Sequence, residues 1–329
     1  MSSVIKKIMP DTSTSSPLAL GIDFGGTSVK LGLVRDGQLV TRGTPIPTSG
    51  HTQADDLFAD ILHGIATLRA NAAPVAIGVG LPGPVDHEAG IVHELSNVPG
   101  WANVPLRDQL RRETGLPTCI DNDAKAMTYA EWKFGAGRGG RNVICVTLGT
   151  GVGGGLILEG KLFRGSRNGA GEIGNVSIDY RGVPGNYGNF GAVEKYVGNR
   201  EIAARAVELY ARAGGRARSL DECTPLALED AARAGDAIAQ GLWRETGEML
   251  GACLADVVWL LNPDSIVLGG GVAKAGDLIF TPLRETIAAR TSRVFSERLQ
   301  IVPAQLGSDA GLIGAAALGV DQAAAAATA

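Results

Sequence analysis

Short apolar runs alternate with turn residues at the start of the chain. Apolar positions predict strands at residues 18–23 and 29–34, and the segment between them contains Gly25, Gly26 and Thr27. An Asp36–Gly37 pair then leads into a third apolar run at 38–40. Because short turns of this composition join antiparallel neighbours, the pattern predicts a three-stranded meander.

The same plan returns in the middle of the chain. A run at 143–147 is followed by a Gly/Thr turn, a second run at 153–158 and a Glu159–Gly160 pair. The segments GIDFGGTSVKLGLVRDG and VTLGTGVGGGLILEG share the order of strand, Gly-Thr turn, strand and acidic-Gly turn. We interpret this as a distant internal duplication, and the alternative is a chance similarity of two glycine-rich hairpins.

Between and after the two meanders, apolar residues recur three and four positions apart, which is typical of helices. The spacing predicts helices at 55–69, 104–114, 124–134, 200–213, 238–261, 277–289 and 310–318, and further strands at 75–79, 117–120, 265–268 and 300–302. The order predicts an α/β protein of two lobes with a ligand cleft between them. We expect a flexible tail at 1–17, a first lobe at 18–123, a second lobe at 124–309, a helix at 310–320 that packs back on the first lobe, and a flexible tail at 321–329.

Composition changes this picture in one respect, the glycine content. The 329 residues are 45% hydrophobic and 19% charged, as in ordinary soluble proteins. Glycine accounts for 47 of them, about twice its usual share. No Gly-X-Y period accompanies it, which excludes a collagen-like chain. The glycines therefore indicate tight turns where the backbone approaches something closely.

Charge and cysteine content limit which binding partners and which cellular compartment we expect. The formal net charge is −4, which argues against nucleic-acid binding and against a polybasic membrane patch. Four cysteines, Cys119, Cys145, Cys223 and Cys253, form no CxxC pair, and we expect them to be reduced and mostly buried. Without a run of 18 apolar residues or a signal-peptide pattern, we expect a cytoplasmic protein with no membrane contact.

Two glycine turns are candidates for phosphate binding. Consecutive backbone N–H groups in such turns form an anion-binding concavity. The candidates are Gly25-Gly26-Thr27 and Gly149-Thr150-Gly151, and the alternative for each is a simple tight β-turn. Two matched hairpins, one in each lobe, favour a polyphosphate held between the lobes. A third cluster, Gly269–Gly271, follows a strand and is either a surface for a nucleoside or a strand-to-helix turn.

Carboxylates at strand ends are the candidates for metal binding and proton transfer. Asp23 ends the first strand just before the first glycine turn, where it would hold Mg²⁺ near phosphates or cap the turn. Asp121, Asn122 and Asp123 end a strand and start a helix. Each could serve as an N-cap, but a carboxylate at that place could also act as general base toward a substrate hydroxyl.

These residues together resemble the ROK family (repressor, open reading frame, kinase) of sugar kinases in the hexokinase–actin-like superfamily. The resemblance covers about residues 18–318 and implies two ribonuclease-H-like, actin-like α/β lobes with a ligand cleft between them. Its carriers are Gly21-Ile-Asp-Phe-Gly-Gly-Thr27, Gly80-Leu-Pro-Gly-Pro-Val-Asp86, Asn97-Val-Pro-Gly-Trp101, Asp121-Asn-Asp-Ala124, Leu148-Gly-Thr-Gly-Val-Gly-Gly-Gly155, Gly169-Ala-Gly-Glu-Ile-Gly174 and Ile266-Val-Leu-Gly-Gly-Gly271.

The resemblance also implies roles for single residues. Asp123 is implied as the catalytic base, and Asp23 as the residue that organises Mg²⁺, directly or through water. The implied sugar ligands are Gly83, Pro84, Asn97, Asn122, Asp123, Glu172, Asn175 and Glu194. The implied nucleotide contacts are Asp23, Gly25, Gly26, Thr27, Lys30, Thr150, Gly151, Gly270 and Gly271.

The chain departs from the family at a structural zinc site. Members usually carry a His after the GEIG segment and three Cys in the loop that follows, and these four residues bind zinc. Here Asn175 takes the His position, while Gly185, Tyr187 and Ala192 take the Cys positions. We therefore predict no structural zinc. We expect packing through Tyr187 and Phe190 to hold the loop instead.

The function implied by the resemblance is ATP-dependent phosphorylation of a hexose at its 6-hydroxyl, with glucose as the first candidate. Asn175 keeps open another hexose or an N-acylhexosamine, such as mannose, fructose, allose, N-acetylmannosamine or N-acetylglucosamine. The sequence also leaves open polyphosphate as donor, a sugar-sensing repressor and a sugar-binding pseudokinase. Relatives are often dimers, so a homodimer is expected. Only about 17 residues precede the first strand, too few for the DNA-reading module of a ROK repressor.

Overall fold

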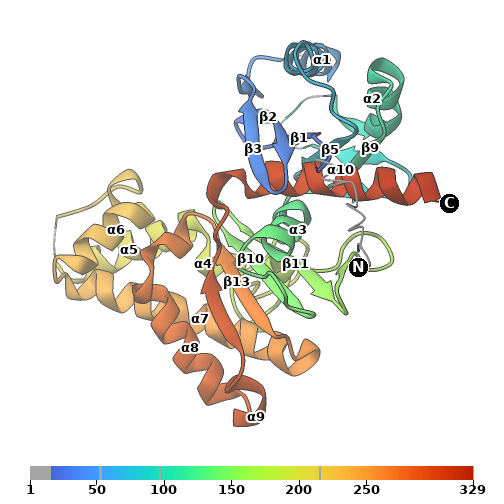
Figure 1. Ribbon diagram of the computed structural model, residues 1–329. Helices are drawn as coiled ribbons and strands as arrows, with labels where there is room; N and C mark the ends of the chain where they lie inside the picture. Colours follow the sequence, from blue (N-terminus) through green and yellow to red (C-terminus); the bar gives the residue numbers. More distant parts are fainter. Residues whose placement is uncertain (1–15, 52–53, 96–97, 99, 215, 329) are drawn as a thin grey trace, which may run out of the picture.

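The computed structural model describes residues 16–51, 54–95, 98, 100–214 and 216–328, which form two lobes (Figure 1). The first lobe is built on a sheet in the order β3-β2-β1-β5-β9, with β4 paired to β2. Its strands are β1 (Ala19–Phe24), β2 (Ser28–Arg35), β3 (Gln38–Arg42), β4 (Ile46–Pro47), β5 (Ile77–Leu81) and β9 (Thr118–Asn122). A small sheet of β6 (Val85–Asp86), β7 (Ile91–Glu94) and β8 (Ala102–Val104) lies beside it.

The second lobe repeats this sheet. Its order is β12-β11-β10-β13-β14, formed by β10 (Val143–Leu148), β11 (Val152–Leu158), β12 (Lys161–Phe163), β13 (Ser265–Gly269) and β14 (Gln300–Pro303). In the first sheet β1 pairs antiparallel with β2 and parallel with β5. In the second sheet β10 pairs in the same way, antiparallel with β11 and parallel with β13. The matching topology confirms that the two halves share one plan, as the sequence repeat predicts.

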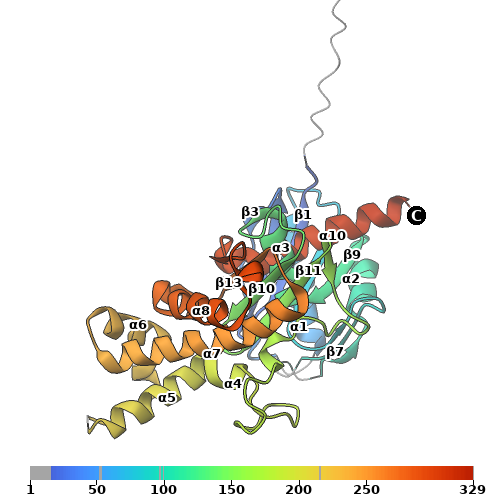
Figure 2. The ribbon, with the colours of Figure 1, turned by 90° about the horizontal axis from the view of Figure 1, so that it is seen from below.

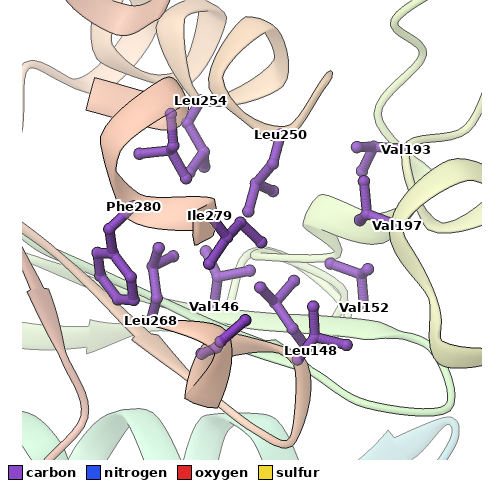
Figure 3. Close-up of a cluster of buried hydrophobic side chains, with 14 of the residues drawn as sticks. Val146, Leu148, Val152, Val193, Val197, Leu250, Leu254, Leu268, Ile279 and Phe280 are labelled. Atoms are coloured by element: carbon purple, nitrogen blue, oxygen red, sulfur yellow. The ribbon is translucent and has the colours of Figure 1, made fainter. Parts of the chain in front are cut away.

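Helices cover one face of each sheet. In the first lobe these are α1 (Ala54–Arg69) and α2 (Leu106–Thr114), whose apolar side chains share a core with β1 and β2. In the second lobe, the helices α5 (Asn199–Arg212), α6 (Pro225–Arg233), α7 (Ala237–Leu261) and α8 (Asp277–Arg290) lie away from α1 and α2 (Figure 1). Helices α5 and α6 are farthest from the first lobe in both views (Figure 2). Their core includes Leu250 and Leu254 of α7 against Val146 of β10 (Figure 3). Shorter helices are α4 (Glu194–Val197), α9 (Arg293–Ser296), η1 (Ile173–Asn175), η2 (Asp221–Cys223), η3 (Val272–Ala275) and η4 (Gly307–Asp309).

The other face of each sheet is covered by a helix that follows the opposite lobe's last strand. Helix α3 (Asp123–Phe134) leaves β9 and packs against β10 and β11, while α10 (Ala310–Thr328) leaves β14 and packs against β1 and β5. The two helices also pack on each other, and a Cβ on Gly314 would lie 1.7 Å from the Ala126 carbonyl oxygen. The chain therefore links the lobes twice, and the site lies beside these links.

Part of the glycine excess serves this packing rather than turns. Gly21 and Gly78 are cross-strand neighbours on β1 and β5, on the face that α10 covers. A Cβ at Gly21 would lie 2.2 Å from the Leu312 carbonyl oxygen, and one at Gly78 would lie 1.6 Å from that of Ala315. Bare strands thus let the α10 backbone lie directly on the sheet, a use of glycine that the turn interpretation misses.

The end of the chain differs from the expected tail at 321–329, because α10 continues to Thr328. Alanine has the highest helix propensity, and residues 323–327 are all alanine. Asp321 also fixes this turn, since it accepts hydrogen bonds from the Tyr129 hydroxyl and, at 2.8 Å, from Lys133 Nζ of α3. By length and hydropathy residues 307–328 could cross a membrane, but half of that window is buried in the protein, and α10 is a core helix.

Candidate active site

A cavity of about 1360 Å³ brings together residues of both lobes. Its walls come from both glycine hairpins, the junction of β9 and α3, and the segments at 82–88, 164–169 and 186–187. Ten residues predicted for the site line it, namely Gly26, Gly83, Pro84, Asn122, Asp123, Thr150, Gly151, Glu172, Asn175 and Glu194.

Asp123 is the first residue of α3, at the cavity wall. Asn122 supplies the N-cap, since its Oδ1 accepts a hydrogen bond of 3.2 Å from the Lys125 N–H. The Asp123 carboxylate accepts one hydrogen bond of 2.8 Å, from the Ala124 N–H. Burial is the largest cause that raises the pKa of Asp123 to about 6; the carboxylates of Asp23 and Glu172 add to the rise, and the hydrogen bond from the Ala124 N–H opposes it. A base of this strength is ionised at neutral pH and can still take a proton during reaction.

Asp23 lies near the end of β1, close to the cavity but not on its wall. Its Oδ2 is 3.5 Å from Lys30 Nζ. Burial raises the pKa of Asp23, while the Lys30 ammonium opposes that shift. Mg²⁺ is usually held by one or two carboxylates together with phosphate oxygens and water, so a single carboxylate beside a phosphate cradle fits this ion. The described residues contain no cluster of three or more metal-ligating side chains.

Each of the two hairpins has open space at one turn residue, Gly26 in the first and Gly149 in the second, which we call the crest of the hairpin. The Gly25 N–H donates to the Ser28 carbonyl and the Gly149 N–H to that of Gly151, each at 2.9 Å. A Cβ on Gly26 or Gly149 would meet no atom within 4 Å, so there is room at each crest for a ligand. A Cβ on Gly151 would instead lie 2.3 Å from Glu194 Oε2.

The remaining nucleotide candidates lie outside the cavity wall. Gly25 and Thr27 flank Gly26 in the turn of the first hairpin, Lys30 lies on β2, and Gly270 and Gly271 follow β13. Gly270 has φ +89°, and a Cβ there would lie 2.1 Å from the Leu148 carbonyl oxygen. Glycine is therefore required where this turn meets the strand before the second hairpin. Asn97, a predicted sugar ligand, lies outside the described residues.

Glu194 is the best-fixed of the predicted sugar ligands. Its Oε2 accepts a hydrogen bond of 2.9 Å from the Val152 N–H, at the start of β11. Its Oε1 accepts one of 2.9 Å from Asn186 Nδ2. Glu172 precedes η1 and Asn175 ends it, so both reach the cavity from one short turn.

The expectation that Tyr187 and Phe190 pack to hold the loop is wrong, because their side chains are 81% and 48% exposed. Hydrogen bonds hold it instead. Ser177 Oγ donates to the Phe190 carbonyl at 2.6 Å, and Asn189 Nδ2 donates to that of Asn175 at 3.1 Å. Isolated β-bridges join 177 to 192 and 184 to 190. A glycine-rich, polar loop of this kind satisfies its own backbone rather than burying aromatic rings.

Two residues that join the lobes beside the cavity carry no signal in the sequence. Arg164 Nε donates to Asp121 Oδ2 at 2.8 Å, and Asn168 Nδ2 donates to Oδ1 of the same carboxylate at 3.1 Å. Asp121 is buried on the first lobe, whereas Arg164 and Asn168 belong to the second. They lie between β12 and the GEIG segment and belong to no motif, so no local signal marks them.

A family model described as "ROK family" matches residues 19–322. The chain belongs to the ROK family. It is 34% identical over 314 residues to the glucokinase of Thermotoga maritima, covering 91% of this chain and 96% of that one. It is also 34% identical to the glucokinase of Streptomyces coelicolor over 315 residues, covering 92% and 97%.

ROK structures share the fold. The glucokinase of Streptomyces griseus, solved with glucose and AMPPNP, is 32% identical with a TM-score of 0.75, covering 92% of this chain and 99% of that one. ROK repressors match as well, but over less of their length, as with the 59% of Escherichia coli Mlc that is covered. The predicted family and the two-lobed α/β class are thus confirmed.

Proposed function

We propose that this ROK protein is a kinase that transfers the γ-phosphoryl group of ATP to the 6-hydroxyl of a hexose, with glucose as the preferred substrate. The observation that carries the proposal is the position of Asp123. Its carboxylate, with a pKa near 6, lines the same cavity as the open crest of Gly26 and the Thr150 turn. A base and two phosphate cradles on one cavity fit transfer from a polyphosphate to a hydroxyl.

The reaction follows from this placement. Asp123 accepts the proton of the 6-hydroxyl as the sugar oxygen bonds to the γ-phosphorus and the bond to the β-phosphate oxygen breaks. Glu172, Asn175 and Glu194 hold other sugar hydroxyls, so the reacting hydroxyl is presented in one orientation. Backbone N–H groups of the two hairpins bind the phosphate oxygens. Mg²⁺, held by Asp23 and the phosphates, would supply charge neutralisation.

Glucose is favoured over other hexoses because two relatives at 34% identity, aligned over more than nine-tenths of both chains, are named glucokinases. Asn175 changes the set of donors and acceptors that faces the sugar, so mannose, fructose, allose and N-acylhexosamines are the comparison substrates. ATP is favoured as donor because the Streptomyces griseus structure contains an ATP analogue. We further propose that the protein is a homodimer and that it is cytoplasmic. Four buried cysteines without disulfide bonds fit a reducing compartment.

The test is product formation from a panel of sugars. Purified protein is incubated with Mg²⁺, with ATP or polyphosphate as donor, and with each sugar, and the product is identified by ³¹P NMR. We expect glucose 6-phosphate from glucose and ATP at the highest kcat/KM. Glucose binding without any sugar phosphate would show a non-catalytic sugar sensor, and a higher kcat/KM with another sugar would replace glucose as the substrate.

A further inference from the structure

The tip of the loop at 177–192 reaches the part of the cavity wall that carries Asn175 and Glu194, two of the predicted sugar ligands. Asn186 and Tyr187 are on the cavity wall, and the Tyr187 side chain is 81% exposed. Tyr180 of the same loop is 74% exposed but is not on the wall. The loop thus offers two exposed tyrosines, of which one faces the site.

Hydrogen bonds fix the direction in which this tip points. The Gly185 N–H donates to the Asn189 carbonyl at 2.8 Å, next to the bridge between Pro184 and Phe190. Asn189 Nδ2 also donates to the carbonyl of Asn175, which itself lines the cavity. Asn186 and Tyr187 are therefore carried on a closed turn that is anchored to the wall of the site.

Asn186 helps to orient the carboxylate of Glu194, a predicted sugar ligand on the cavity wall. Its Nδ2 donates to Glu194 Oε1, and the Val152 N–H donates to Oε2, both at 2.9 Å. Each carboxylate oxygen can accept about two hydrogen bonds, so each keeps capacity for a substrate hydroxyl. Because one donor holds each oxygen, the plane of the carboxylate is fixed before any sugar arrives.

We infer that Asn186 and Tyr187 determine which sugars this site accepts. Asn186 is a positioning residue that orients Glu194 toward one hydroxyl of the sugar, and Tyr187 supplies an aromatic surface that covers the ring. The substrate class is a hexopyranose with a free hydroxyl opposite Glu194, in preference to its deoxy analogue. The inference rests on the proposed function for the kind of ligand that the cavity holds.

The role of Asn186 predicts a change in discrimination. A site built to hydrogen-bond a hydroxyl strongly rejects the analogue that lacks it. We expect the wild type to favour glucose over one of the 1-, 2-, 3- and 4-deoxyglucoses by at least ~100-fold in kcat/KM. Asn186→Ala leaves Glu194 with a single anchor, so that ratio should fall at least ~10-fold, whereas a general structural defect would scale all sugars alike.

The role of Tyr187 predicts a change in binding with little change in chemistry. Contact made equally in the bound sugar and the transition state affects KM and leaves kcat unchanged. We expect Tyr187→Ala to raise the KM for glucose about 10-fold with kcat within about twofold, and Tyr187→Trp to restore the KM. Tyr180→Ala is the matched control, and its KM should equal that of the wild type. Tyr180, Asn186 and Tyr187 are all exposed, so the melting temperatures of the variants should equal that of the wild type.

Calorimetric titration with glucose alone separates this inference from the proposed function. We expect Tyr187→Ala to weaken glucose binding about 10-fold and Tyr180→Ala to leave it unchanged. Glucose binding without turnover would overturn the kinase proposal and leave this comparison valid. Equal affinities for the two variants, or an unchanged ratio for every deoxyglucose in Asn186→Ala, would overturn the inference. Absence of binding by any hexose would overturn both.

Discussion

The carboxylate of Glu131 on α3 accepts hydrogen bonds from the backbone N–H of Gln305, at 2.9 Å to Oε1 and 3.1 Å to Oε2. It also accepts from the N–H groups of Leu306 and Ala136. Ala136 lies in the link from α3 to β10, and the other two lie in the link from β14 to α10. One fully buried side chain therefore ties the C-terminal end of α3 to the segment through which the chain leaves β14 for α10.

Replacing that carboxylate should destabilise the whole protein. Glu131→Gln keeps one acceptor oxygen and leaves at least one part-buried N–H without this partner, which costs up to about 1–3 kcal/mol. We expect a lower melting temperature by differential scanning calorimetry. Glu208→Gln is the control, because Glu208 forms an exposed ion pair with Arg212 worth at most about 0.5 kcal/mol. Equal melting temperatures for the two variants would refute the fastening role.

Removal of the proposed base should abolish turnover and spare binding. Asp123→Asn keeps the size of the side chain and cannot accept the proton, so kcat should fall by about 10²–10⁴-fold. Calorimetry should show glucose affinity close to that of the wild type. A variant that keeps more than about a tenth of kcat would rule out Asp123 as the base.

The pH dependence of the reaction should report the same carboxylate. With the pKa of Asp123 raised to about 6, chiefly by burial, the ionised base is lost as the pH falls through 6. We expect kcat/KM to be constant above pH 7 and to fall about tenfold per unit below pH 5.5. A profile that stays flat down to pH 4.5 would contradict the assignment.

Asp123 should also make the protein less stable than its amide variant. Its pKa is higher in the folded protein than the ordinary 3.8, so the folded state binds the proton more tightly than the unfolded state does. Ionisation therefore costs folding free energy, from zero below pH 3.8 to at most about 3 kcal/mol above pH 6. Asp123→Asn should melt above the wild type at pH 7, with a smaller difference at pH 5. No difference at pH 7 would count against a buried, ionised carboxylate.

The loop at 177–192 should be indifferent to zinc. Hydrogen bonds hold it, and the described residues contain no cluster of zinc ligands. We expect purified protein to contain far less than one zinc per chain by elemental analysis, and chelation to leave the melting temperature unchanged. Ser177→Ala, which removes a loop hydrogen bond, should loosen the loop in hydrogen exchange. A stoichiometric zinc content would contradict this account.

The features that the sequence predicts well depend on neighbours in the chain. The hairpins at Gly26 and Thr150 and the strand-end position of Asp123 follow from local alternation and turn chemistry. Arg164, Asn168 and Asn186 were missed because their partners, Asp121 and Glu194, lie on other elements. The exposure of Tyr187 shows the same limit, since an aromatic residue packs only where the fold brings a surface to it.

Helix α10 follows the last strand of the second lobe but covers the sheet of the first, and this affects the order in which the two lobes can fold during synthesis. The face of the first sheet that carries Gly21 and Gly78 has no cover until α10 has left the ribosome. The second lobe can bury its main core earlier, because that core uses no residue beyond Ile301. The first lobe's core under α1 and α2 uses no residue beyond Ile120, so during synthesis this lobe can start to fold first but receives the cover of its other sheet face last.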